Sequence, residues 1–380
     1  MSLRRPALTL GIEEEYLLVD PETRSLASRP PAGFMRRCEE ILGGRVTHEF
    51  LQSQIEVGTS VCPSIDDAQK ELAHLRGTIA ACAREFGLCI IAASTHPWAS
   101  WHQQAPVELD RYRILTQEHQ ALARRMVICG MHVHAGIEDD NLRIDLMNQA
   151  TYFLPHLLAL STSSPFWEGC NTGLKAFRPT VFGNLPRSGV PEAFESATDW
   201  NEMLAILQET GLCDDATKIW WDIRPSAKHP TLEMRICDMC TKLADAMTVA
   251  AFYQSILAYL YQLRASNQTW RKYRRTLVAE NKWRAQRYGL QGTLADFGRR
   301  TLVPFADLVE ELIALLGDQA RELGCLAHLE RAREIVRDGT SADHQLKVYH
   351  AALEAGASEH EAQVKVVDWL IEASLEGCAA

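Results

Sequence analysis

The 380-residue sequence predicts an α+β fold in which helices pack against one face of an antiparallel sheet and leave the other face open. Up to about residue 240, segments that alternate apolar and polar residues are mixed with helical patterns, whereas residues 241–380 are mainly helical in their periodicity. Strand-like segments at 217–224 and 231–237 are joined by the turn PSAKHP, which favours an antiparallel hairpin. We therefore expect a single domain over residues 1–380.

The first strand is expected at residues 8–19, where alternation separates an apolar face from a face that carries Glu13 and Glu15. Glu14 falls on the apolar face. A carboxylate there requires a buried partner, unless the strand bulges and turns the side chain away. The residues leave both alternatives open.

The remaining elements follow in order along the chain. Residues 164–191 are rich in Gly, Pro and aromatic residues without periodicity, and long irregular loops of this kind usually serve function. Before this loop, the patterns predict helices at 34–42, 64–86, 108–125 and 140–163 and strands at 88–94 and around His132 and His134. After residue 238, they predict helices at 239–265, 268–288, 293–316, 317–337, 341–355 and 358–376.

Four strand segments carry acidic, amide, imidazole or guanidinium side chains two residues apart, and such side chains share one face of a strand. Crowded carboxylates are unfavourable unless cations offset their repulsion, and hard oxygen ligands suit Mg²⁺ or Mn²⁺. The segments are GIEEEYLLV with Glu13 and Glu15, LQSQIEV with Gln52, Gln54 and Glu56, CGMHVHAG with His132 and His134, and TLEMRIC with Glu233 and Arg235.

Glu13, Glu15 and Glu56, together with His132 or His134, are therefore candidate ligands for two or three divalent ions. Glu49 has the wrong parity to share the strand face of Glu56. It could reach the site from a turn or bulge, or it could be an exposed residue where the strand begins.

A second charged group combines Glu233 and Arg235 with Arg224 on the preceding strand. An arginine fork beside metal ligands could hold a transferring phosphoryl group, although a cross-strand ion pair is the simpler interpretation. In the irregular loop, Arg178 and Arg187 could bind a substrate carboxylate or lie over aromatic rings.

The helix predicted at 268–288 places three polar side chains on neighbouring positions of one face: Asn281, Arg284 and Arg287. They could bind nucleotide phosphates, or they could form a solvated basic face.

Composition limits the partners. The formal net charge of −10 argues against nucleic acid or an anionic membrane as the main partner. No apolar run approaches the length that spans a bilayer, and the N-terminal residues lack a secretory signal. Eleven cysteines without regular spacing indicate reduced thiols, so we expect a cytoplasmic protein.

Taken together, these blocks resemble the type 2 glutamate–cysteine ligases, carboxylate–amine ligases of the glutamine synthetase-like superfamily. The resemblance extends from about residue 9 to residue 290. The matching blocks are GIEEEY at 11–16, HEFLQSQIEVGT at 48–59, CGMHVHAG at 129–136, SPFWEG with LPRSGVP within 164–191, WWDIRPSAKHPTLEMRICD at 220–238 and AENKWRAQRYG at 279–289.

The resemblance implies a funnel formed by an antiparallel sheet of about six strands, with helices behind it and ATP with Mg²⁺ or Mn²⁺ inside. It implies metal ligands at Glu13, Glu15, Glu56, Glu233, either His132 or His134, and Glu49. Arg235 is implied to stabilise an acyl-phosphate, and Arg178 to contact a substrate carboxylate. The implied protein is a homodimer that joins the γ-carboxylate of glutamate to an amine, with cysteine as the first expectation.

Two other functions are compatible with parts of the sequence. The His-x-His pattern also occurs in zinc hydrolases that cleave amide bonds without ATP, although the surplus of glutamates favours harder cations. A protein that binds glutamate or nucleotide without turnover is the other alternative, and the intact set of charged residues argues against it.

Overall fold

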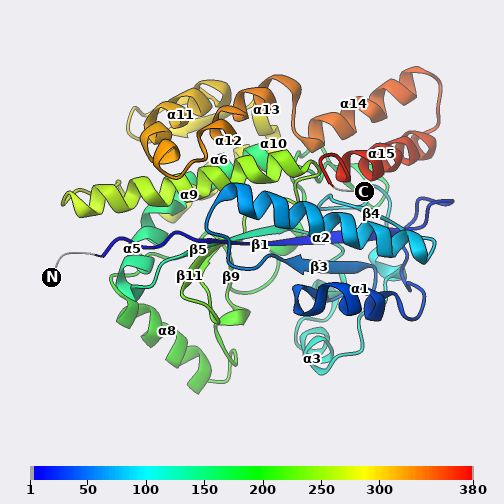
Figure 1. Cartoon of the computed structure of the whole chain (residues 1–380), viewed down its shortest axis with the longest axis horizontal. Helices are drawn as coiled ribbons and strands as arrows, with labels where there is room; N and C mark the ends of the chain where they lie inside the picture. The colour runs from blue at the N-terminus through cyan, green and yellow to red at the C-terminus, as the bar shows by residue number, and fades with distance from the viewer. Residues whose placement is uncertain (1–3, 379–380) are drawn as a thin grey trace.

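The computed structural model describes residues 4–378, and its centre is a seven-stranded antiparallel sheet (Figure 1). The strand order is β10-β11-β5-β1-β3-β2, and β4 pairs with the C-terminal end of β1. The prediction of an antiparallel sheet is confirmed, with one strand more than the six expected. The strands are β1 (Leu10–Val19), β2 (Val46–His48), β3 (Gln54–Gly58), β4 (Cys89–Ile91), β5 (Met131–Gly136), β10 (Ile223–Pro225) and β11 (Thr231–Met234).

The strand register brings the polar side chains to one face of the sheet. Glu15 of β1 lies opposite Glu56 of β3, and Glu13 lies opposite His132 of β5. On the next pair, His134 of β5 lies opposite Glu233 of β11. Because directly opposite residues project on the same side of a sheet, this register alone assembles an acidic and imidazole-rich floor.

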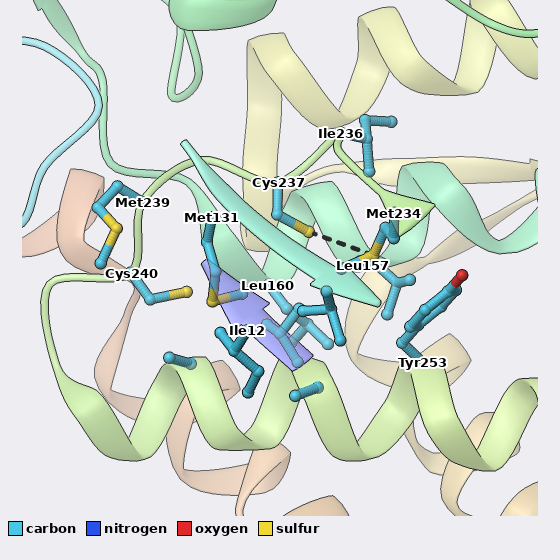
Figure 2. Packing of buried hydrophobic residues seen from close by; sticks show 14 of the residues in the cluster. Ile12, Met131, Leu157, Leu160, Met234, Ile236, Cys237, Met239, Cys240 and Tyr253 are labelled. Carbon is cyan, nitrogen blue, oxygen red and sulfur yellow. Dashed lines mark hydrogen bonds between the residues drawn. The ribbon is translucent and has the colours of Figure 1, made fainter. Parts of the chain in front are cut away.

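The other face of the sheet is apolar and packs against helices α2 (Ile65–Glu85), α6 (Leu154–Ser161) and α9 (Leu243–Ala265). Figure 2 shows Met131 and Met234 from the sheet in the same buried cluster as Leu157 and Tyr253 from two of these helices. All four side chains are at most 1% exposed. Burial of this apolar surface is the main force that holds the helices behind the polar floor.

Glu14 has a buried partner rather than a strand bulge. Its carboxylate accepts hydrogen bonds from Arg76 of α2 at 2.6 and 3.0 Å and from the Tyr16 hydroxyl at 2.5 Å. Both side chains of the ion pair are fully buried. The same guanidinium donates to the carbonyl oxygens of Cys240, Thr241 and Ser374, so it links the first strand to the C-terminal helices.

The C-terminal third is mainly helical, as predicted, but three predicted helices are partly wrong. The helix expected at 268–288 begins only at Arg275, and the one expected at 317–337 is divided among α11 (Phe305–Glu322), α12 (Leu326–Glu330) and α13 (Ala332–Asp338). The third is the helix expected at 293–316. Residues 293–304 form the hairpin β12 (Thr293–Asp296) and β13 (Thr301–Pro304) instead of the first turns of a helix. Leu294 and Val303 lie opposite each other and are both buried, so this cross-strand apolar pair outweighs the helical pattern here. The helices of this part are α9, α10 (Arg275–Tyr288), α11, α12, α13, α14 (Ser341–Glu354) and α15 (Glu359–Ser374).

The strand predicted at 217–224 is divided. β9 (Trp220–Trp221) pairs in parallel with β8 (Ser188–Gly189), whereas β10 pairs with β11 as expected. The irregular loop contains β6 (Phe166–Trp167), β7 (Cys170–Asn171) and α7 (Arg178–Phe182). The other helices are α1 (Phe34–Leu42), α3 (Asp110–His119), α4 (Ala121–Arg124), α5 (Asp140–Ala150) and α8 (Ala197–Glu209), with 3-10 turns at 43–45, 101–103, 151–153, 216–218 and 289–291.

Among the described residues, α9 alone is long and apolar enough to cross a membrane, although 89% of its apolar window is buried inside the protein. This burial is typical of a core helix, and Figure 1 shows α9 running along the helical layer.

Candidate active site

A cavity of about 410 Å³ opens on the polar face of the sheet. Its walls come from the sheet, from α3 and α7, and from the segment before β9. Most of the predicted metal and substrate residues meet there: Glu13, Glu15, Glu49, Glu56, His132, Arg178, Arg224 and Arg235 line the cavity. Sites of this kind, concave and rich in convergent charged groups, are the usual location of an active centre.

Glu13, His134 and Glu233 form the first ligand group, and one ligand atom of each lies within 4.8 Å of the others. His134 Nε2 is 3.4 Å from Glu13, and its Nδ1 is 2.9 Å from the Thr231 hydroxyl. The Arg224 guanidinium donates to Glu233 at 3.0 Å, and Arg235 also donates to this carboxylate.

The charges around this first group favour ionised carboxylates. Burial opposes ionisation of Glu233, but Arg235 and Arg224 hold the pKa of its carboxyl well below the usual range. Burial likewise opposes ionisation of Glu13, and the adjacent imidazoles of His132 and His134 lower its pKa. The first group is thus close to electrically balanced by the protein's own cations.

The second group, Glu15, Glu49 and Glu56, lacks such balance. One carboxylate oxygen of each lies within 4.8 Å of the others, and neither Glu49 nor Glu56 forms an ion pair within residues 4–378. Burial, together with repulsion from the neighbouring carboxylates, raises the pKa of Glu15 and of Glu49 to about 7 and that of Glu56 well above its usual value. This group is short of positive charge.

His132 lies between the two groups. Its Nδ1 donates to Glu13 at 3.0 Å, and its Nε2 is 3.9 Å from Glu15. The Nε2 atoms of His132 and His134 are buried and have no hydrogen-bond partner among residues 4–378. Orphaned imidazole nitrogens beside converging carboxylates fit divalent cations, and the number of oxygen donors fits Mg²⁺ or Mn²⁺ better than a structural zinc ion.

Glu49 reaches the second group from the turn that follows β2. Its backbone position is outside the strands, and its carboxylate accepts a hydrogen bond from the Phe50 N–H at 3.0 Å. The sequence left two alternatives for Glu49, a turn that brings it into the site or an exposed position where the strand begins. The structure has the first of these.

Arg178 is the buried cation of the cavity without an acidic partner. Its side chain is 4% exposed, lines the cavity and makes one hydrogen bond, at 3.2 Å, to the carbonyl oxygen of Arg235. No ion pair is formed by Arg178 among the described residues. A buried guanidinium with unused donors is suited to bind an anionic ligand, and a carboxylate matches its planar geometry.

Six predicted ligand residues do not line this cavity. Two of them, His134 and Glu233, each have a ligand atom within 4.8 Å of Glu13, which does line it. The other four have different partners. Asn281 holds β12 through both backbone groups of Ala295, and Arg284 donates to the carbonyl oxygen of Thr293 at 2.6 Å. Arg287 donates to the carbonyl oxygen of Gly173. Arg187 donates to the carbonyl oxygen of Lys218 at 3.0 Å and lies over the Trp220 ring. It therefore packs over an aromatic ring, the second of the two roles that its sequence position allowed.

Several cavity residues were missed by the sequence analysis. Lys228 could have been found, because it lies in the turn PSAKHP that joins the two strands carrying Arg224 and Glu233. The others carry no local signal, because they come from very short strands and turns and from the helices α3 and α7, none of which has a clear sequence pattern. They are Thr47, Arg111, Tyr112, Phe182, Lys218 and Trp220.

Comparison with known proteins identifies the group to which this site belongs. Residues 9–366 match the family described as Glutamate-cysteine ligase family 2 (GCS2). The chain belongs to this family. A relative from Rhodospirillum rubrum, provisionally named glutamate–cysteine ligase 2, is 54% identical over 373 residues, covering 97% of this chain and 96% of the relative. A relative from Jannaschia sp. with the same provisional name is 50% identical and covers 96% of each chain.

Two solved structures share the fold at low sequence identity. Glutamate–cysteine ligase from Francisella tularensis, in complex with AMP, has a TM-score of 0.67 at 14% identity and covers 100% of this chain and 94% of that chain. A bifunctional glutathione synthetase from Pasteurella multocida has a TM-score of 0.68 at 16% identity and covers 96% of this chain and 52% of that chain. The glutamine synthetase-like fold is confirmed.

Membership of the Glutamate-cysteine ligase family 2 confirms two predictions made from the sequence. The resemblance stated from the motif blocks is correct, and the protein is an enzyme of the carboxylate–amine ligase class. An ATP-dependent ligase is the activity that the family supports.

Proposed function

We propose that this enzyme joins the γ-carboxylate of glutamate to an amine, with ATP converted to ADP and phosphate and γ-glutamyl phosphate as the intermediate. The observation that carries the proposal is one cavity lined by Glu13 of the first group, by all three carboxylates of the second group, and by Arg178 and Arg235. Anionic substrates can enter an acidic cavity only if cations accompany them, which is the arrangement that phosphoryl transfer needs.

The side chains divide the work between them. Glu13, His134 and Glu233 would hold one divalent cation, and Glu15, Glu49 and Glu56 a second. Bound Mg²⁺ or Mn²⁺ supplies positive charge that offsets the repulsion between the substrate carboxylate and the phosphates. Arg178 binds a carboxylate of glutamate, and Arg235 stabilises charge on the transferring phosphoryl group. His132, which lies between the two groups, holds Glu13 through a hydrogen bond.

The proposed reaction has two steps. An oxygen of the γ-carboxylate bonds to the γ-phosphorus of ATP, and the bond from that phosphorus to the bridging oxygen of ADP breaks. The amine nitrogen then bonds to the acyl carbon, the bond from that carbon to the phosphate oxygen breaks, and the nitrogen loses a proton. The site contributes positioning and fixed positive charge to both steps.

Assignments beyond the family are part of this proposal. Cysteine is the acceptor to test first. We further propose that residues 1–380 form a single catalytic domain, and that the enzyme is a homodimer in the cytoplasm. The AMP bound to the Francisella tularensis ligase supports a nucleotide in the same fold. All cysteines among the described residues are free thiols, which supports a reducing compartment. Nucleotide contacts from Asn281, Arg284 and Arg287 are not part of the proposal.

Release of ADP tests the proposed reaction. We expect ADP to form only when glutamate, an amine and Mg²⁺ or Mn²⁺ are all present, and omission of any one to reduce the rate to background. The measurement is a coupled ADP assay with cysteine first and then a panel of amines. Nucleotide binding without turnover for any acceptor would instead support a binding protein, and amide cleavage without ATP would support a hydrolase.

The second carboxylate group makes metal binding dependent on pH. Glu15 and Glu49 have pKa values of about 7 without metal, so a cation must displace protons below that pH. Raising the pH through 7 removes these competing protons. We therefore expect the apparent affinity for Mn²⁺ to rise on the order of 100-fold from pH 6 to pH 8 if two protons are displaced.

Calorimetry in buffers of different ionisation enthalpy measures the protons released by Mn²⁺. The Glu49→Gln variant is the matched comparison, because it removes one of the three carboxyls whose pKa is raised and should therefore release fewer protons when Mn²⁺ binds. Affinity that does not change with pH, and binding without proton release, would contradict the proposed ligand set.

A further inference from the structure

Gly130, immediately before β5, contacts both the second carboxylate group and Arg178. Its N–H donates to Glu15 at 2.7 Å. A Cβ atom added to Gly130 would lie 2.3 Å from Nη2, 2.7 Å from Cζ and 2.9 Å from Nε of Arg178. The guanidinium therefore occupies the space that any other residue would fill with its side chain. The backbone of Gly130 is outside the left-handed region, so this close approach is the reason that glycine is needed.

The backbone of Arg178 is held from the opposite side. Ser164 Oγ accepts hydrogen bonds from the N–H groups of Phe177 and Arg178 at 2.7 and 3.0 Å. The same hydroxyl donates to Asp238 at 2.7 Å, and Asp238 forms an antiparallel bridge with Gly130. The bridge between Gly130 and Asp238 thus fixes Gly130, and through the hydrogen bond from Ser164 to Asp238 it also fixes the start of α7.

Two contacts hold the guanidinium beside Gly130. It donates to the carbonyl oxygen of Arg235 at 3.2 Å, and its Cζ lies 5.5 Å from the centre of the Phe182 ring. With the backbone anchored through Ser164, a methyl group on Gly130 must displace the guanidinium itself. The N–H of residue 130, which holds Glu15, is unaffected by that methyl group.

We propose that Gly130 is a positioning residue for Arg178. Because Gly130 has no side chain, the Arg178 guanidinium can lie beside Glu15, where it binds the carboxylate of the acyl donor. This inference rests on the proposed function, because it takes glutamate as the ligand of Arg178. It adds a residue that sets specificity for the acyl donor without touching it.

The test compares Gly130→Ala with Gly58→Ala in steady-state kinetics. In the control, the added Cβ would be 4.0 Å from its nearest neighbour, an ordinary contact on the same sheet. For Gly130→Ala we expect the KM for glutamate to rise roughly 10- to 100-fold, the range that corresponds to losing one charge-assisted hydrogen bond. The KM for ATP should stay within about twofold, and Gly58→Ala should change neither constant by more than about twofold.

A double-mutant cycle separates positioning from a general structural effect. If Gly130 acts through Arg178, then Gly130→Ala should change kcat/KM for glutamate by less than about twofold once Arg178→Ala is present. If Gly130→Ala does not fold, the double variant should fold, because the obstructing guanidinium is gone. Failure of both variants to fold would overturn the inference.

The outcomes distinguish this inference from the proposed function. Wild-type protein that forms no ADP with glutamate overturns the proposed function. An active wild type with equal rises in the KM for ATP and for glutamate in Gly130→Ala, or with additive effects of the two substitutions, overturns the positioning role alone.

Discussion

Replacing Arg235 with methionine is expected to lower kcat roughly 1000-fold while the protein keeps its fold, on the scale seen when an arginine that stabilises phosphoryl transfer is lost. Arg235 lines the cavity, and its backbone N–H donates to the carbonyl oxygen of Asp222 at 2.8 Å. Its Nε is buried and has no hydrogen-bond partner in the part of the chain that the structure describes. Its guanidinium donates to Glu233. This fixed charge is available to a phosphoryl group at no cost of reorganisation.

The remaining ion pair limits the structural damage of this substitution. Glu233 keeps the hydrogen bond from Arg224 at 3.0 Å, so its carboxylate does not become an unpaired buried charge. Steady-state kinetics of ADP release should show the loss in kcat, with the KM for ATP changed by less than about tenfold. Arg333→Met, at an exposed ion pair with Glu310, is the matched control and should have wild-type kinetics. A decrease of less than about tenfold in kcat would remove Arg235 from the proposed chemistry.

The sequence predicted the floor of the site because strand alternation is a local rule. Glu13 and Glu15, or His132 and His134, share a face wherever they form a strand. What alternation could not supply was the pairing of strands distant along the chain. The register that sets Glu15 opposite Glu56 and Glu233 opposite His134 depends on the packing of the whole apolar face.

The α10 residues show where local patterns mislead. Three polar side chains on one helical face were consistent with a phosphate site, yet their partners are backbone groups of the β12–β13 hairpin and of Gly173. That hairpin was itself expected to be helical, so its unpaired backbone groups could not be anticipated. A polar helical face and a face that caps a neighbouring hairpin have the same sequence pattern.

The role of Gly130 could not be predicted either, because it depends on a residue distant in the sequence. Glycine beside His132 carries no charge and suggests only a turn or a close approach. Its role depends on Arg178, which follows 48 positions later in a loop without periodicity. Contacts of this kind are set by the tertiary fold, and a single sequence does not contain them.

Replacing Arg76 with methionine is expected to destabilise the protein by about 3–5 kcal/mol, because it leaves the Glu14 carboxylate buried without its cation. The hydrogen bond from Tyr16 remains but cannot neutralise the charge. Glu14 also lies between Glu13 and Glu15 on β1, so strain here affects the register that forms both ligand groups. The measurement is the urea denaturation midpoint of the variant against wild type.

The double variant Glu14→Leu with Arg76→Met separates the charge from the other contacts of the guanidinium. Removing both members of a buried ion pair is usually less harmful than removing one, so part of the stability should return. Recovery should be incomplete, because the carbonyl oxygens of Cys240, Thr241 and Ser374 still lose their donor. Arg37→Met, at an exposed pair with Glu85, should change stability by no more than about 0.5 kcal/mol. If Arg76→Met unfolds at the same urea concentration as Arg37→Met, the buried pair does not stabilise the junction between β1, α2 and the C-terminal helices.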